Sequence, residues 1–294
     1  IAIPEFGTSF VRQMLMDTRP TTMEELVRIS GLSHGTDVWL GNAQDLIKSG
    51  VATLSEVICT RDDIMNYLIL HGCEPSMSFK TMENVRKGKG LTPEMEAFLR
   101  ENNIPEWFET SCKKIKYMFP RAHAAAYVMM AFRVAYYKVY YPKEFYSVYF
   151  TVRADAFDIR YSLGDAQETL KNIRTLEGKG DKISQKEKDL ITVLEVVYEM
   201  KLRGIRLLPI TLNESAATNF RVERDGIRPP FSAIPGVGEN AAIAIAHAVS
   251  ENKSFTSVED FARRSKANAS TIDLMRSMGM FEGLGETDQI SMFG

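Results

Sequence analysis

The chain has 294 residues, of which 45% are hydrophobic and 25% are charged, and its formal net charge at pH 7 is −2. These values are ordinary for globular proteins, so an intrinsically disordered chain is excluded and two domains of usual size are expected. Cys59, Cys73 and Cys112 form no CxxC pair, which argues against a disulfide framework or a zinc site. No apolar run approaches the ~18 residues of a membrane span, so we expect a cytoplasmic protein.

Helical signals dominate up to about residue 204. Thr21 and Glu24 predict a capping box at the start of a helix that Gly31 would close. The Thr-Pro-Glu sequence at 92–94 predicts a second start, because proline is favoured at the first helical position. The Ser and Glu at the ends of 184–187 predict another capping box, and apolar residues at helical spacing follow it.

The run 111–142 holds six lysines and arginines and no carboxylate, with an aromatic or apolar residue beside nearly every charge. Small residues at 124–126 favour a packed helix whose start carries the cations. Free N–H groups and the positive dipole end favour an anion there, so a polyphosphate or a nucleic-acid backbone is the implied ligand. The alternative is a solvated basic face with core aromatics. A cluster of charges creates an electrostatic field but does not by itself indicate a binding site.

The composition changes near residues 203–209, where we expect a domain boundary. Residues 219–222 and Ile227 flank Arg224, Asp225 and Gly226, a tight-turn sequence that predicts a short β-hairpin.

The sequence Ile-Pro-Gly-Val-Gly at 234–238 precedes a helix through 240–245. Glycines in the turn allow positive φ and remove side chains, so that the backbone can approach a phosphate while the N–H groups of the helix point outward. The pattern resembles a helix-hairpin-helix motif, a sequence-independent reader of duplex backbone. The simpler alternative is a turn between two helices.

A degenerate second copy is predicted by a helix starting at 257–261 and another at 270–278 that ends at Gly279. Residues 206–294 hold nine basic and eleven acidic side chains, so phosphate binding would depend mainly on backbone amides. The last six residues, 289–294, resemble the peptide by which bacterial polymerases hold the sliding clamp. Large apolar groups at a terminus are unfavourable unless a partner buries them.

The segment 119–145, FPRAHAAAYVMMAFRVAYYKVYYPKEF, resembles the fingers signature of family C bacterial replicative DNA polymerases. The matching positions are His123, the three alanines that follow it, Tyr127, Lys138 and the Tyr-Pro pair at 141–142. Residues 1–15 and 27–47 are similar to the PolC-type polymerase III alpha subunit, and the resemblance covers the whole chain.

The resemblance implies a mainly α fold and the C-terminal portion of such a polymerase. The expected parts are a helical fingers domain at 1–205, a helix-hairpin-helix domain with a short β-hairpin at 206–285, and a clamp-binding tail at 286–294. The parent would be a DNA-directed DNA polymerase using Mg²⁺ held by palm aspartates outside this chain, so this portion alone should be inactive. Its partners would be primer-template DNA, a deoxynucleoside triphosphate, the sliding clamp and the rest of the polymerase, with no membrane.

The resemblance and the charge pattern together predict three sets of contacts and no catalytic or metal-binding residue. The expected nucleotide-binding residues are Arg61, Lys113, Lys114, Lys116, Arg121, His123 and Tyr127. The expected DNA-binding residues are Arg86, Lys87, Lys89, Pro235, Gly236, Val237, Gly238, Lys253, Arg263, Arg264 and Lys266. The expected clamp-binding residues are Gln289, Ile290, Met292 and Phe293.

Two other classes of protein remain open. A DNA-repair or adaptor protein would also use helix-hairpin-helix contacts, and a base-excision glycosylase would need a catalytic aspartate, for which Asp260 has suitable spacing. We interpret Asp260 instead as part of a helix surface. A purely structural helical protein would bind no DNA. Asp62 and Asp63 are not expected to form a metal site, since neighbouring side chains point in different directions.

Overall fold

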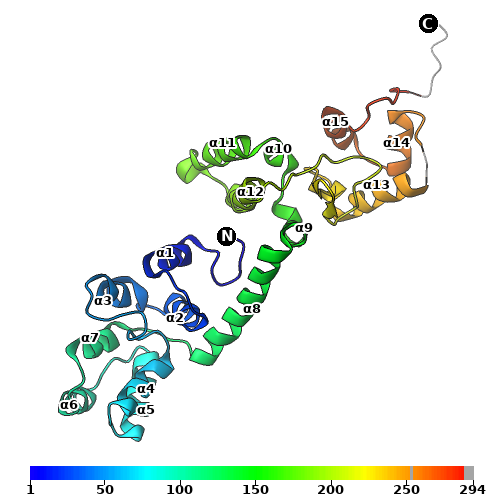
Figure 1. The fold of residues 1–294 in the computed structure, drawn as a ribbon. Helices are drawn as coiled ribbons and strands as arrows, with labels where there is room; N and C mark the ends of the chain where they lie inside the picture. Colours follow the sequence, from blue (N-terminus) through cyan, green and yellow to red (C-terminus); the bar gives the residue numbers. More distant parts are fainter. Residues whose placement is uncertain (252–253, 288–294) are drawn as a thin grey trace, which may run out of the picture. The chain divides into compact units, whose positions relative to one another are not determined.

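The computed structural model describes residues 1–251 and 254–287, and Figure 1 traces their elements along the chain. The predicted mainly α fold is confirmed, because helices dominate and the described strands form a single two-stranded antiparallel sheet. The chain divides into two compact units, Ile1–Ala135 and Tyr136–Gly294. The predicted boundary near 203–209 lies inside the second unit, directly after a long helix.

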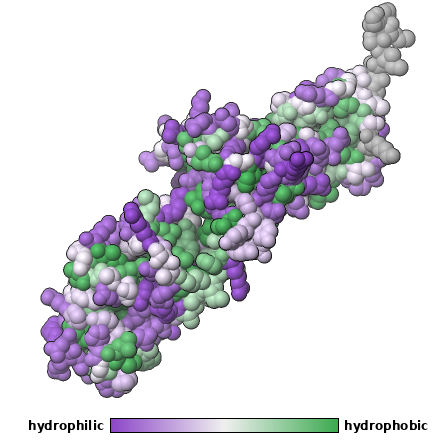
Figure 2. All heavy atoms as spheres, viewed as in Figure 1, coloured by the Kyte–Doolittle hydropathy of each residue, from purple (hydrophilic) through white to green (hydrophobic). Residues whose placement is uncertain are grey.

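Helices make up the first unit. They are α1 (Ser9–Thr18), α2 (Met23–His34), the π-helical turn η1 (Trp39–Ala43), α3 (Gln44–Lys48), α4 (Arg61–Leu70), α5 (Pro75–Arg86), α6 (Pro93–Glu101), α7 (Glu106–Lys114) and α8 (Arg121–Tyr140), which continues into the second unit. One hydrophobic core joins α1 to α7, and Ile64, Leu68, Leu99 and Phe108 are fully buried in it. Ala124 and Val128 of α8 form a separate buried cluster with Val27 of α2. On the face shown in Figure 2, hydrophilic and hydrophobic residues are interspersed over this unit.

The second unit begins with the end of α8. It contains α9 (Pro142–Val152), η2 (Ala154–Ala156), α10 (Ile159–Ser162), α11 (Ala166–Glu177), η3 (Gly180–Lys182), α12 (Gln185–Leu202), β1 (Arg221–Glu223), β2 (Gly226–Arg228), η4 (Phe231–Ala233), α13 (Glu239–Glu251), α14 (Val258–Ser265) and α15 (Ala269–Ser277). α11 and α12 pack through Ile173, Leu176, Leu190 and Leu194. The buried Lys138 at the end of α8 pairs with Glu199 of α12 at 2.8 Å.

Several predicted boundaries are confirmed. Thr92 caps α6 with Pro93 in its first turn, and Ser184 and Glu187 form the capping box of α12. The predicted hairpin is present as β1 and β2, with Val222 opposite Ile227. None of the helices in the described ranges is both long and apolar enough to cross a membrane.

The prediction for α2 was wrong in two details. The capping box uses Thr22 and Glu25, one residue later than expected, and α2 continues past Gly31 to His34. Gly31 does not end the helix. A Cβ at this position would lie 2.7 Å from the Cys59 carbonyl oxygen, so glycine is required by the close packing of α2 on the chain before α4.

Candidate nucleotide and DNA interface

Two basic segments that the sequence separates lie side by side in the first unit. The amide of Met118 donates to the Arg86 carbonyl at 3.3 Å, which joins the segment between α7 and α8 to the glycine-rich loop 86–90. Gly88 has a φ of 70°, and a Cβ there would lie 2.4 Å from the Lys116 carbonyl oxygen. On its other edge the same segment pairs with Thr36, which donates to the Tyr117 carbonyl at 2.9 Å. The cations of these two segments therefore lie close together in the first unit.

Several of these cations are engaged by carboxylates. Lys113 Nζ lies 2.7 Å from Glu109 and 3.0 Å from Glu96. Arg86 and Lys87 both contact Glu83, at 2.9 Å and 2.8 Å. Hydrogen bonds from Arg86 and Lys87 lower the pKa of Glu83 to about 2, so this carboxylate stays ionised at neutral pH. The charge of Lys113 is thus largely compensated, whereas Arg86 and Lys87 share one carboxylate that offsets only one of their two charges.

Three other predicted cations on this surface have no carboxylate partner in the described ranges. Lys114 Nζ donates to the Gly41 carbonyl at 2.6 Å, which fixes its position but leaves its charge unneutralised. Lys89 and Lys116 are exposed, and neither ammonium has a hydrogen bond or ion pair with any residue that the structure describes. Lys89 and Lys116 are therefore the cations best placed to meet an external anion.

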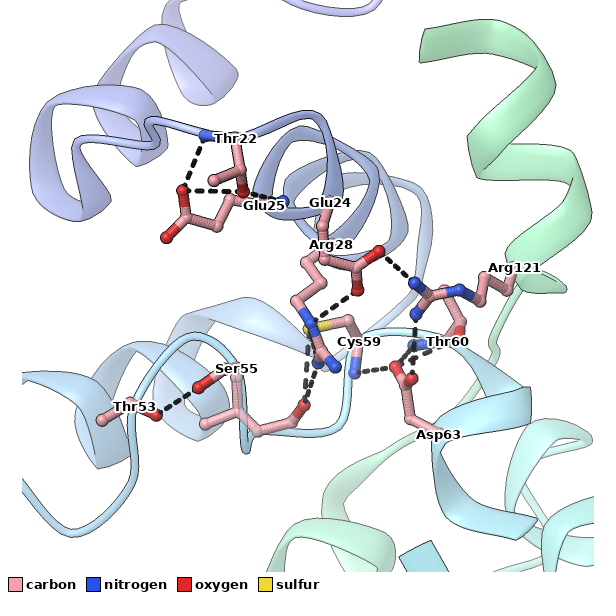
Figure 3. A network of polar contacts seen from close by, with 11 residues as sticks. Thr22, Glu24, Glu25, Arg28, Thr53, Ser55, Cys59, Thr60, Asp63 and Arg121 are labelled. Atoms are coloured by element: carbon pink, nitrogen blue, oxygen red, sulfur yellow. Dashed lines mark hydrogen bonds and ion pairs between the residues drawn. The ribbon is translucent and has the colours of Figure 1, made fainter. Parts of the chain in front are cut away.

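Arg121, the first residue of α8, reaches toward α2 and α4 (Figure 3). Its guanidinium contacts Glu24 closely and lies 3.5 Å from Asp63 Oδ1. Glu24 also receives a hydrogen bond of 3.1 Å from Arg28 Nε. The hydrogen bond from Arg121 is the largest of several effects that lower the pKa of Glu24, so this carboxylate is ionised at neutral pH.

The start of α8 was predicted to offer free amides to an anion, but Asp62 occupies one of them. Asp62 Oδ2 accepts the Arg121 amide at 2.6 Å. Asp63 Oδ2 accepts the amides of Cys59 and Thr60 at 3.0 Å and 2.7 Å, which completes the capping box of α4. The two neighbouring carboxylates therefore serve different helix starts. Among residues 1–251 and 254–287, no group of three or more His, Cys, Asp or Glu side chains is arranged to hold a metal ion.

A row of rings lies next to Arg121. Phe119 stacks on His123 with ring centroids 4.8 Å apart, and His123 lies 4.5 Å from Tyr127. Tyr117 meets Phe119 edge-on at 5.1 Å, and the Tyr127 side chain is 49% exposed. Sequence reasoning missed Tyr117 and Phe119, which precede α8. For Phe119, the available signal was its spacing of four residues from His123, which repeats from His123 to Tyr127.

Arg61 approaches the same row of rings through its backbone. Its amide donates to the Phe119 carbonyl at 3.1 Å, while its buried Nε has no hydrogen-bond partner among the described residues. Orphan buried donors are uncommon in proteins and call for an explanation.

In the second unit, the predicted hairpin turn lies between η4 and α13. Gly236 has a φ of 84°, whereas Gly238 is not in the left-handed region, so only one glycine is required by backbone conformation. No atom lies within 4 Å of a Cβ placed at either glycine. Val237 is buried and its amide donates to the Ile234 carbonyl at 3.0 Å, which closes the turn. The backbone of both glycines therefore faces open space that a phosphate can enter.

A cavity of about 460 Å³ adjoins this turn. Pro235, Gly236, Val237 and Gly238 form one wall, and residues of η2, α10 and α12, including Lys186, form the other. The charges around it are mixed, because Asp155, Asp158 and Glu187 line it together with Arg160 and Lys186.

The predicted second helix pair is confirmed as α14 and α15. Lys266 ends α14 in the left-handed conformation. The interpretation of Asp260 as a helix surface was wrong, because its side chain is fully buried and contacts Arg263 and Arg264. The predicted DNA contact Lys253 and the predicted clamp residues Gln289, Ile290, Met292 and Phe293 lie outside the described residues.

Comparison with known proteins agrees with this arrangement. Residues 1–103 match the family described as the bacterial DNA polymerase III alpha subunit finger domain, and residues 204–290 match the helix-hairpin-helix motif family. The two matches fall on the segments where the sequence predicts a fingers part and a helix-hairpin-helix part. DNA polymerase III PolC-type of Caldanaerobacter subterraneus is 54% identical over 100% of this chain, which covers 21% of that protein.

Two further relatives with the same name give the same result. The Clostridium perfringens protein is 53% identical and the Thermotoga maritima protein 54% identical, each over 99% of this chain. This chain covers 20% and 21% of them, so it spans about a fifth of the length of these relatives. The predicted resemblance to the fingers and duplex-binding portion of a PolC-type polymerase is confirmed.

Proposed function

We propose that this chain supplies the nucleotide- and DNA-binding parts of a replicative DNA-directed DNA polymerase of the bacterial cytoplasm. The observation that supports this most directly is the 54% identity, across the whole chain, to a protein named DNA polymerase III PolC-type. The Mg²⁺ ions and the carboxylates of the chemical step would belong to parts of the longer polymerase outside this chain.

The first unit would bind the incoming deoxynucleoside triphosphate and the template. Lys116 and Arg61 would approach the phosphates, where positive charge offsets the negative charge of the transferred group. The row from Phe119 to Tyr127 offers ring faces, and an exposed ring such as Tyr127 can stack on a base at a strength of about 1–3 kcal/mol. Lys89, on the adjoining loop, would face the template.

The second unit would hold the primer-template duplex through the turn at 234–238, and the tail at 289–293 would bind the sliding clamp. Open space in front of Gly236 and Gly238 supports a backbone contact with phosphate. A repair glycosylase is less well supported, because the candidate Asp260 is buried and engaged by two arginines.

The test is a substitution of Lys116 in the full-length polymerase. Lys116→Ala should weaken the apparent affinity for the incoming nucleotide about tenfold, because a hydrogen bond to a charged group contributes roughly 1.5–3 kcal/mol. Single-turnover incorporation at varied nucleotide concentration gives this affinity, and anisotropy gives the duplex affinity. Lys188→Ala, an exposed lysine on α12, is the matched control. Equal losses in nucleotide and duplex affinity for Lys116→Ala would place Lys116 on the DNA and contradict its assigned role.

A further inference from the structure

Asp260 is a fully buried carboxylate that holds two arginines of its own helix. Its Oδ1 accepts from Arg263 Nη2 at 2.5 Å and from Arg264 Nε at 2.8 Å. These positions follow Asp260 by three and four residues, so all three side chains share one face of α14. The other oxygen, Oδ2, accepts the Thr256 amide at 3.4 Å.

The arginines extend from this buried anchor to the surface. The side chain of Arg263 is 65% exposed and that of Arg264 is 37% exposed. Arg264 also lies over the Phe255 ring, with 6.0 Å between its guanidinium carbon and the ring centroid. A guanidinium has five N–H donors in a fixed plane, so a contact with Asp260 orients the group without exhausting its donors.

Asp260 is ionised at neutral pH. Burial alone would raise its pKa, but the hydrogen bond from the Thr256 amide and the charges of Arg264 and Arg263 outweigh burial and lower the pKa below its ordinary value. A buried carboxylate is unfavourable unless it is paired, so this one fixes where its partners lie. Arginines held in advance lose less conformational entropy when they bind a phosphate.

We propose that Asp260 is a positioning residue that holds Arg263 and Arg264 as a preorganised pair for two phosphates of the DNA backbone. This inference depends on the proposed duplex-binding function. It assigns Asp260 an effect opposite to that of its charge, since a carboxylate near DNA would otherwise only repel it.

Repulsion and positioning predict opposite effects on duplex affinity when the charge of Asp260 is removed. The same domain offers a matched control for this test. Asp273 on α15 also contacts an arginine three residues later, Arg276 at 2.6 Å, but its side chain is 72% exposed. Asp260→Asn and Asp273→Asn change the net charge equally. Duplex affinity of the full-length polymerase is measured by anisotropy at several salt concentrations.

Asp273→Asn should leave duplex affinity unchanged or slightly raise it. Asp260→Asn should weaken duplex binding about fivefold. It should also reduce the slope of log affinity against log salt by about one to two, because each lost phosphate contact lowers that slope by about 0.9. Binding by Asp260→Asn as tight as wild type, with an unchanged circular dichroism spectrum, would overturn the proposal.

A second pair of variants keeps the test decisive if Asp260→Asn fails to fold. Arg263→Lys and Arg264→Lys preserve charge but lose the planar donors, so both should weaken duplex binding if orientation matters. Wild-type affinity in both lysine variants would overturn the proposal.

A further variant, Gly238→Asp, tests the proposed duplex-binding function separately from the role of Asp260. Position 238 tolerates a Cβ, and the new carboxylate would repel a phosphate at the turn. Suppose that the wild type binds duplex, that Gly238→Asp weakens this binding, and that Asp260→Asn and both lysine variants do not. The positioning role of Asp260 would then be contradicted, while the proposed duplex-binding function would stand.

Discussion

At the scale of single residues, the clustered cations of the first unit differ in what already neutralises them. Lys113 stands between Glu96 and Glu109, whereas Lys116, three residues later, contacts no carboxylate in the described ranges. A triphosphate would have to displace two carboxylates to reach Lys113, but only water to reach Lys116. Position in the sequence alone gives these lysines the same expected role, and the ion pairs separate them.

Lys113→Ala in the full-length polymerase should therefore leave nucleotide affinity within about twofold of wild type, because surface ion pairs contribute little and the lysine is already paired. The measurement is single-turnover incorporation at varied nucleotide concentration. A loss for Lys113→Ala as large as that for Lys116→Ala would show that the ion pairs with Glu96 and Glu109 open on binding.

Gly31 sets the distance between α2 and the segment before α4. Gly31→Ala should destabilise the first unit by roughly 1–3 kcal/mol, because the new Cβ would approach the Cys59 carbonyl oxygen to 2.7 Å. Urea unfolding followed by tryptophan fluorescence reports this unit, since both tryptophans of the chain, Trp39 and Trp107, lie in it. Gly238→Ala meets no neighbouring atom and should leave the transition unchanged.

At the scale of elements, local signals were predictable and long-range partners were not. The caps of α6 and α12 involve residues within four positions, so sequence alone located them. The pairing of Glu109 with Lys113 was also visible as an i,i+4 pair, and we missed it. The contact of Glu24 with Arg121 spans 97 residues, and it depends on how α2 and α8 pack. The burial of Asp260 likewise depends on tertiary packing that no local pattern reveals.

The capping box of α12 predicts a pH dependence. Hydrogen bonds from Lys179 and from the Ser184 amide and hydroxyl lower the pKa of Glu187 from an ordinary 4.5 to about 2. Because the folded value lies below the unfolded one, this stabilisation is present above about pH 4.5 and is lost as the pH falls toward 2.

NMR titration of the Glu187 side chain checks this value directly. Lys179→Ala should move the pKa of Glu187 back toward 4.5, while Lys182→Ala, on the same loop, should not. At pH 7, Ser184→Ala should cost about 1 kcal/mol of stability, as is usual for the loss of an N-cap. An unchanged Glu187 titration in Lys179→Ala would contradict the predicted cause.

At the scale of the whole molecule, the two units offer separate functions on one chain. The first carries the cations and rings proposed for nucleotide and template, and the second carries the turn and arginines proposed for duplex. Sequence alone indicated both, because each depends on a compact motif. Under the proposed function, the chemical step and its Mg²⁺ site would lie in the remaining four fifths of the relatives' length.

Deleting residues 289–293 from the full-length polymerase should abolish binding to the sliding clamp and leave duplex affinity unchanged. The reason is that the apolar side chains of the tail would fill pockets on the clamp, whereas duplex contacts lie elsewhere. Surface plasmon resonance with immobilised clamp measures the first quantity and anisotropy the second. Clamp binding that survives the deletion would contradict the assignment of residues 289–293 as the clamp-binding peptide.

The contact between Gly88 and the Lys116 carbonyl has a consequence for how this sequence can evolve. A side chain at position 88 would collide with the backbone and would also require a strained φ, so the two basic segments can stay together only if position 88 is glycine. Gly50 and Gly72 also have positive φ but open surroundings, so asparagine is tolerable there. Selection should therefore remove substitutions at position 88 and accept them at positions 50 and 72. A glycine at position 88 would then identify relatives that retain this surface.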